Sequence, residues 1–449
     1  MNATSAAAPG GLRTGLRKEC LGFAEVVAQS VANIAPTATP TLLIPLVFAS
    51  AGNGTWLVYV IATMGLLLVS ANINGFARRS ASAGSLYSYV HDSTHPKLGA
   101  LTGWALFRAY LFTAAAVPLA FASYASLLLG ASSLAAQMAL VCAVTLLSFA
   151  MAYKDVRLST KSLLALESVS VTLIVLLATV VVARHGWNLR GPQFSLDGVT
   201  GEGVRLGLVL AVFSYVGFES ATALGGEARD PLITIPRSVT ASVAAAGIFF
   251  VLMSWIEVEG FRASGLALDK TSAPLVSLAE TTHAPFFAAP ISVGACFAFF
   301  ACCLASINAG ARVLYAMARG GQIHPGLGGA HARNATPHVA VAVTSALALL
   351  LPSGLLLAGA AILDAYAYLG TIATFGFLAV YIVVSLAAPF HLKRAGELKG
   401  RDVAVAIGSA LFMVVPLVGS VYPVPAAPYD RLPYVFAALM AAGGVFLLR

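Results

Sequence analysis

Apolar residues of this chain occur in stretches long enough to cross a lipid bilayer. Windows of about 20 apolar residues predict an all-α membrane protein with twelve transmembrane helices. Composition agrees, because 59% of the residues are hydrophobic and 10% are charged, whereas about 25% is usual in soluble domains. The expected spans are 21–50, 54–76, 98–126, 130–152, 160–183, 204–225, 235–257, 285–317, 337–353, 360–389, 402–421 and 432–448.

The basic residues predict which ends of the spans face the cytoplasm. With the N-terminus inside, 19 of the 26 Lys and Arg residues fall on or near the cytoplasmic side, six fall outside, and Arg108 lies within a span. This asymmetry follows the positive-inside rule. It predicts a multi-pass protein of the cell membrane with both termini in the cytoplasm, including an N-terminal tail at 1–20 without a signal-peptide pattern.

Several partner classes are not expected. The net charge of +8 is spread over the ends of the spans rather than gathered in one patch, so the chain is not expected to bind nucleic acid. Its five cysteines lie in or beside apolar stretches and its histidines are scattered, without the spacing of metal ligands. No disulfide scaffold, metal or cofactor is therefore expected.

One apolar segment carries an acidic residue far from the membrane edges. In the run from Phe213 to Ser220, Glu219 follows a glycine inside the sixth predicted span, and a charged loop comes after it. An ionised carboxylate at such a depth costs roughly 2.5–3.5 kcal/mol and usually faces a cavity or a transport pathway. The segment is typical of a carrier.

The first predicted span contains a matching interruption. Pro36 and Pro40 remove amide donors about halfway across the bilayer. Five spans separate the two interruptions, so the two helices enter the membrane from opposite sides, as an inverted repeat requires. Paired discontinuities indicate a midplane binding site, where half-helix N-termini hold a carboxylate and freed carbonyls hold an ammonium group. A simple proline kink is the alternative for the first span taken alone.

Four motifs together resemble the amino acid-polyamine-organocation transporters. The resemblance implies five-plus-five inverted repeats, at 21–183 and 204–389, with two further helices at 402–449. It also implies uptake or exchange of amino acids or related amines by alternating access. The motifs are the Glu219 segment, the loop from Glu227 to Arg237, the run from Ser306 to Arg319, and the segment from Gly84 to Tyr89 continuing to Gly103 and Trp104.

The resemblance also implies site residues. The first broken helix would hold the substrate's carboxylate and amino groups, Phe213 would be an aromatic lid, and Glu219 would couple substrate binding to gating. Some relatives carry a lysine in the fifth helix, at a place near Ser168 or Ser170 here, so the coupling ion is left open. The implied substrate-binding residues are Ser30, Asn33, Ile34, Ala35, Thr37, Phe213, Ser214 and Val216.

Alternatives remain beside an amino acid carrier. A polyamine or other organic amine exchanger is one, and a membrane receptor or scaffold without transport is another, whereas no nucleophile and base constellation points to an enzyme. An amino acid is favoured over a diamine because Glu219 is the one buried anion expected near the site. Ala35 and Val216 suggest a neutral side chain, and Glu167 is expected near a cytoplasmic helix end, within reach of water or basic neighbours.

Overall fold

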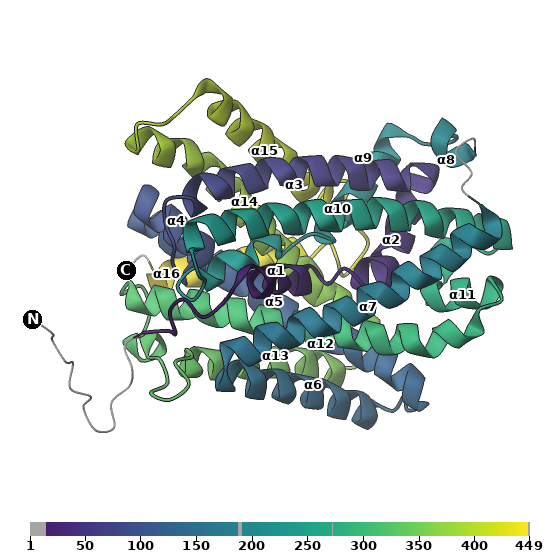
Figure 1. Ribbon diagram of the computed structural model, residues 1–449, viewed down its shortest axis with the longest axis horizontal. Coiled ribbons are helices and arrows are strands. Elements are labelled where there is room, and N and C mark those ends of the chain that lie inside the picture. Colours follow the sequence, from purple (N-terminus) through teal and green to yellow (C-terminus); the bar gives the residue numbers. More distant parts are fainter. Residues whose placement is uncertain (1–14, 187–190, 272, 448–449) are drawn as a thin grey trace, which may run out of the picture.

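The computed structural model describes residues 15–186, 191–271 and 273–447. The described part is a bundle of long helices, most of them running along the long axis of the molecule (Figure 1). Apart from an isolated bridge between Leu21 and Ala228, these residues form no β-structure. The expected all-α class is therefore confirmed. Parts of the predicted N-terminal tail (1–14) and C-terminal end (448–449) lie outside the described residues.

The helices follow the predicted order closely. Those up to residue 224 are α1 (Phe23–Ile34), the π-helix η1 (Thr39–Leu43), α2 (Ile44–Ala51), α3 (Thr55–Ala77), α4 (Ser85–Ser93), α5 (Pro96–Leu129), α6 (Leu134–Lys154), α7 (Val156–His185), α8 (Pro192–Ser195), α9 (Gly201–Phe213) and the 3-10 helix η3 (Phe218–Leu224). Those that follow are α10 (Pro231–Ser264), α11 (Pro274–Thr281), α12 (Ala288–Arg319), α13 (His338–Leu357), α14 (Ile362–Arg394), α15 (Gly400–Gly419) and α16 (Leu432–Leu447). Four short 3-10 helices lie in the connections: η2 (Gly52–Gly54), η4 (Leu268–Lys270), η5 (Pro285–Phe287) and η6 (Pro325–Gly328).

Ten helical segments in the described part are long and apolar enough to cross a membrane. The first and second predicted spans form one such segment, Phe23–Ala77, because short connections join α1, α2 and α3. The last predicted span is the shorter apolar helix α16. Several boundaries differ from expectation: α10 begins at Pro231, inside the predicted loop, and ends at Ser264, and α14 continues to Arg394. The predicted outer loop 258–284 also contains α11.

Small residues let the central helices approach closely. A Cβ atom on Gly310 of α12 would lie 3.3 Å from Cβ of Tyr110, and one on Gly376 of α14 would lie 3.0 Å from the Ala105 carbonyl oxygen. Both Tyr110 and Ala105 belong to α5, which packs along α12 and α14. Such contacts are the main source of helix association in a lipid environment. Of these helices, α12 packs against the interrupted helix α1, which also touches α7, α10 and η3.

Candidate functional site

The first break begins where α1 ends, at Ile34. Ala35 adopts a left-handed conformation, with φ 51° and ψ 66°, and the helix resumes as a π-helix at Thr39. The sequence explains the break, because Pro36 and Pro40 have no amide hydrogen and a residue before proline avoids the right-handed helical conformation. The C-terminal end of one helix and the N-terminal end of the next therefore meet in the buried centre of the molecule.

The second break lies between α9 and η3. The chain turns through Ser214–Gly217, and Gly217 has φ 92°. A Cβ atom on Gly217 would lie 1.9 Å from Nδ2 of Asn33, the residue before the end of α1. Glycine is required here by its backbone conformation and by this approach. The two breaks predicted from sequence thus lie against each other.

Hydrogen bonds join the two broken segments on one side of this contact. The Ala221 amide donates to Ser30 Oγ at 2.9 Å, and the Ser220 hydroxyl donates to the Gln29 carbonyl at 3.1 Å. All four groups are buried. Because buried polar groups are costly to leave unpaired, these bonds fix the register of α1 against η3.

Asn33 holds a central position between the breaks. Its Oδ1 accepts a hydrogen bond from Ser306 Oγ at 2.6 Å, and its main-chain carbonyl accepts one from the Cys302 thiol at 3.4 Å. Its Nδ2 is buried and has no partner among the described residues. The hydroxyl of Thr39, at the start of the resumed helix, is likewise buried without a partner. Two donors beside the first break are therefore left without a hydrogen-bond partner among the described residues.

Glu219 is fully buried behind the second break. Tyr110 donates to its Oε1 at 2.6 Å, and Tyr381 donates to its Oε2. The Tyr381 hydroxyl also accepts from the Gly217 amide at 3.2 Å. The carboxyl group thereby ties η3 to α5 and α14, and through Gly217 it connects to the contact between the breaks.

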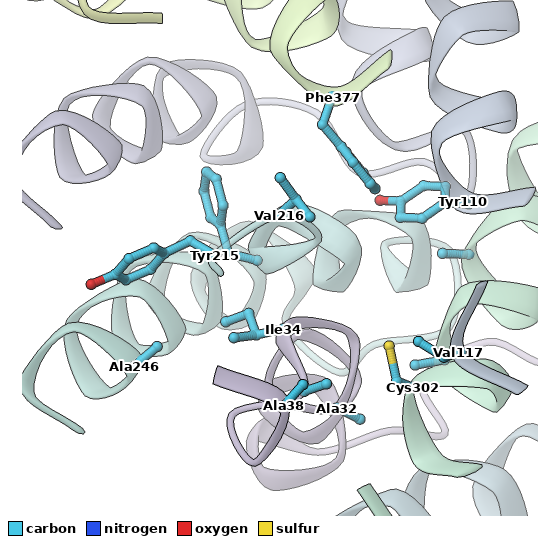
Figure 2. Close-up of a cluster of buried hydrophobic side chains, with 14 of the residues drawn as sticks. Ala32, Ile34, Ala38, Tyr110, Val117, Tyr215, Val216, Ala246, Cys302 and Phe377 are labelled. Atoms are coloured by element: carbon cyan, nitrogen blue, oxygen red, sulfur yellow. The ribbon is translucent and has the colours of Figure 1, made fainter. Parts of the chain in front are cut away.

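Apolar side chains surround the contact between the breaks. Ile34 and Ala38 of the first segment lie on one side and Val216 of the second lies opposite, with Val117 and Cys302 beside them (Figure 2). Ile34 and Val216 are both buried, with 6% and 7% of their surface exposed. The side chains at this position suit an apolar group.

The predicted site residues are not all brought together. Ser30, Asn33, Ile34, Ala35, Val216 and Glu219 belong to the two touching segments. Thr37 instead pairs with Ser170 of α7, at 2.5 Å, and Ser214 lies 3.3 Å from the Tyr59 hydroxyl of α3. Phe213 is half-buried, and its ring packs toward Gly370 of α14.

The sequence did not predict the partners of Glu219 or the burial of two further acidic side chains. Tyr110 and Tyr381, the partners of Glu219, lie on helices far away in sequence. The expectation that water reaches Glu167 is wrong: this side chain is 4% exposed, and neither carboxyl oxygen has a partner among the described residues. Glu257 of α10 is buried in the same unpaired way. Both are visible in the sequence as acidic residues inside apolar helices, which is the available signal.

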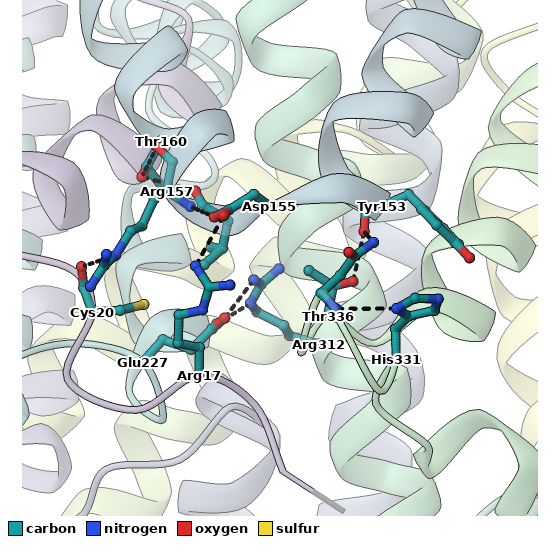
Figure 3. A network of polar contacts seen from close by, with 12 residues as sticks. Arg17, Cys20, Tyr153, Asp155, Arg157, Thr160, Glu227, Arg312, His331 and Thr336 are labelled. Atoms are coloured by element: carbon teal, nitrogen blue, oxygen red, sulfur yellow. Dashed lines mark hydrogen bonds and ion pairs between the residues drawn. The ribbon is translucent and has the colours of Figure 1, made fainter. Parts of the chain in front are cut away.

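A polar network lies at the face of the molecule where α1 begins, the N-terminal face (Figure 3). Glu227 accepts from Arg312 Nε at 2.6 Å and from Arg312 Nη2 at 3.1 Å, and both side chains are buried. The Glu227 carbonyl also accepts from the Cys20 amide at 2.8 Å. Nearby, Arg17 pairs with Asp155 at 2.9 Å. The network joins the start of α1 to α7, α12 and the loop after η3.

The fold and the paired breaks define a polytopic membrane protein with two interrupted helices facing each other in its core. The same fold occurs in the crystal structure of MhsT in complex with L-phenylalanine, with a TM-score of 0.62 at 14% identity, covering 90% of this chain and 99% of that one. A family model described as amino acid permease matches residues 25–421. The chain belongs to the amino acid permease family and is an amino acid transporter.

Curated relatives agree on transport and differ in cargo. The branched-chain amino acid permease BcaP of Bacillus subtilis (strain 168) is 23% identical over 392 residues, which cover 82% of each protein. The methylthioribose transporter of the same organism is 25% identical over 376 residues, covering 78% of this chain and 77% of that protein. Identity at this level leaves the substrate to be argued from the site.

Proposed function

We propose that this chain is a secondary transporter that carries neutral, apolar amino acids across the cell membrane by alternating access. The observation that carries the proposal is the contact of the two helix breaks at Asn33 and Gly217, with a buried amide donor of Asn33 left unpaired beside it. In this account the chain has twelve transmembrane helices. They form inverted repeats at 21–183 and 204–389 and two further helices at 402–449.

The helix ends at the first break suit the two charged groups of an amino acid. The C-terminal end of α1 at Ile34 carries partial negative charge and suits an ammonium group, whereas the helix starting at Thr39 presents partial positive charge to a carboxylate. The unpaired Asn33 Nδ2 and Thr39 Oγ1 supply donors in the same region. We assign head-group binding to Ser30, Asn33 and Ala35, as expected from the sequence, and add Thr39 in place of Thr37, whose hydroxyl pairs with Ser170.

A neutral, apolar substrate side chain fits the remaining surroundings. Ile34 and Val216 flank the break, and Phe213 lies at the end of α9 as the lid. The acidic group of the second segment, Glu219, already accepts hydrogen bonds from two tyrosines. A lysine-like or diamine substrate would therefore find the Glu219 carboxyl group already engaged, which favours the amino acid over the polyamine alternative.

Gating is assigned to Glu219 and to the polar network of the N-terminal face. Glu219 joins the second broken segment to α5 and α14, so substrate contacts at Gly217 are transmitted to both helices. The buried pair of Glu227 and Arg312 holds the N-terminal face closed in this conformation. That face is assigned to the cytoplasm, with both termini, because the sequence predicts 19 of the 26 Lys and Arg residues on or near the side of the N-terminus.

The test is uptake of a labelled amino acid mixture into proteoliposomes, with empty and with amino acid-loaded vesicles, at fixed pH and sodium. Leucine, lysine and putrescine are the competitors. We expect leucine to compete best. Uptake that requires loaded vesicles would identify an exchanger, and uptake into empty vesicles would identify net transport with a coupling ion. Stronger competition by putrescine would favour the amine alternative, and absence of uptake of every substrate would favour a receptor or scaffold.

A further inference from the structure

A basic groove lies at the N-terminal face, away from the helix breaks. A cavity of about 480 Å³ opens between α3, α14 and α15, and one of about 720 Å³ opens between α3 and α10. Asn74, Arg78 and Thr240 line both of them. They therefore form one groove around the C-terminal end of α3, called the α3 groove below.

The α3 groove has an excess of positive charge. Its two acidic residues are already engaged, Glu397 by Arg79 and Asp402 by Arg401 at 3.6 Å. No described residue forms an ion pair with the remaining three cations, Arg78, Arg237 and Lys399. Three positive charges thus remain free to bind an anion. The positive-inside rule explains basic residues at this face, but it does not explain why they line a cavity.

Asn74 provides an independent sign of a ligand. This side chain is 8% exposed, and its Nδ2 donates to Thr240 Oγ1 at 2.7 Å. Its Oδ1 is buried and accepts no hydrogen bond from any described residue. Because a buried carbonyl oxygen normally accepts a hydrogen bond, Asn74 Oδ1 can accept one from a ligand group such as a hydroxyl. Arg78, which can bind an anion, and Asn74, which can accept from a hydroxyl, line the same groove.

The membrane-facing surface above the groove is apolar. On α3, Met64 is 64% exposed and Leu68 is 37% exposed, and on α10 Ile248 is 66% exposed. Ile407 of α15 is 51% exposed. On each helix these residues lie nearer to the middle of the helix than the charged groove residues do, in the direction of the membrane interior. An occupant of the groove would therefore meet cations at one end and hydrocarbon surface at the other.

We propose that the α3 groove binds an anionic phospholipid. The phosphodiester lies among Arg78, Arg237 and Lys399, a headgroup hydroxyl donates to Asn74 Oδ1, and the acyl chains lie along α3, α10 and α15. Basic pockets between transmembrane helices recognise such headgroups in this way. Phosphatidylglycerol has both the phosphodiester and the hydroxyl. The inference depends neither on the transported substrate nor on which leaflet the groove faces.

The experiment is a lipid titration of the purified full-length protein in neutral detergent, followed by native mass spectrometry. Phosphatidylglycerol and phosphatidylcholine with identical acyl chains are compared. The triple variant Arg78→Gln/Arg237→Gln/Lys399→Gln is tested against Lys97→Gln/Lys161→Gln/Arg333→Gln, which removes equal charge from the same face outside the groove. Competition by glycerophosphoglycerol and by inorganic phosphate separates a lipid from a soluble phosphate ligand.

We expect wild type and control to prefer phosphatidylglycerol. The groove variant should bind it roughly 100-fold more weakly, at about fivefold for each cation. Where the triple variant does not fold, Arg237→Gln alone should weaken binding about fivefold. Equal loss in the groove and control variants would overturn the proposal, as would equal affinity for the two lipids. Complete displacement by a soluble phosphate compound would assign the groove to that ligand instead.

Discussion

Replacing Gly217 by alanine perturbs the contact between the two helix breaks directly. Gly217 has φ 92°, and an added Cβ atom would lie 1.9 Å from Asn33 Nδ2. A positive φ of this kind costs a non-glycine residue roughly 1–2 kcal/mol, and overpacking costs about 1–3 kcal/mol more. The conformation in which the breaks touch should therefore lose at least about 2 kcal/mol, or about 30-fold in population at 1.4 kcal/mol for each factor of ten.

The assay is the initial rate of amino acid uptake into proteoliposomes, normalised to the amount of monodisperse protein. Gly354→Ala is the matched control, because an added Cβ there meets no atom within 4 Å and the residue lies inside helix α13. We expect uptake by Gly217→Ala to fall about 30-fold and uptake by the control to stay at the wild-type level. Uptake by folded Gly217→Ala within twofold of wild type would refute the reasoning.

Three further outcomes are expected. Glu219→Gln should keep the protein folded but slow uptake and change its pH dependence, and a variant with the normal rate and pH profile would remove the gating assignment. Arg312→Met leaves Glu227 as an unpaired buried charge, so thermal unfolding should show that the free energy of unfolding falls by about 3–5 kcal/mol. Arg401→Met, in an exposed pair, should lower it by at most about 1 kcal/mol. Equal losses in the two variants would contradict the assigned role of the buried pair. Burial, and to a smaller extent the nearby Glu227 carboxylate, raise the pKa of the Cys20 thiol. In a variant that keeps Cys20 as its only cysteine, the rate of maleimide labelling should therefore still increase above about pH 8.5. A labelling rate that reaches a plateau below that pH would contradict the raised pKa.

Local chemistry made both helix breaks predictable. Pro36 acts on its own neighbours, and the glycine at 217 precedes an acidic residue inside an apolar run, so each interruption is visible without the fold. The contact between them was not predictable at atomic detail. Asn33 and Gly217 are 184 positions apart in the sequence, and the packing of α1 against η3 brings them into contact.

Partners and burial were less predictable than element positions. Glu219 was identified as important, but its two tyrosine partners come from α5 and α14, and no sequence pattern pairs them. Glu167 was misjudged because distance from a helix end does not indicate whether a neighbouring helix covers the side chain. Thr37 and Ser214 were selected from the broken segments, yet within the turns of the breaks their side chains bond to α7 and α3.

The central claim is that an amino acid binds between the breaks and is carried across the membrane. The most direct measurement compares leucine uptake into proteoliposomes by wild type and by Asn33→Ala, with Asn53→Ala, in the connection between α2 and α3, as the control. The account predicts saturable uptake by wild type and control and at least a tenfold loss of apparent affinity in Asn33→Ala, because a bound carboxylate would lose a charge-assisted hydrogen bond worth about 1.5–3 kcal/mol. Unchanged affinity in folded Asn33→Ala would contradict the account.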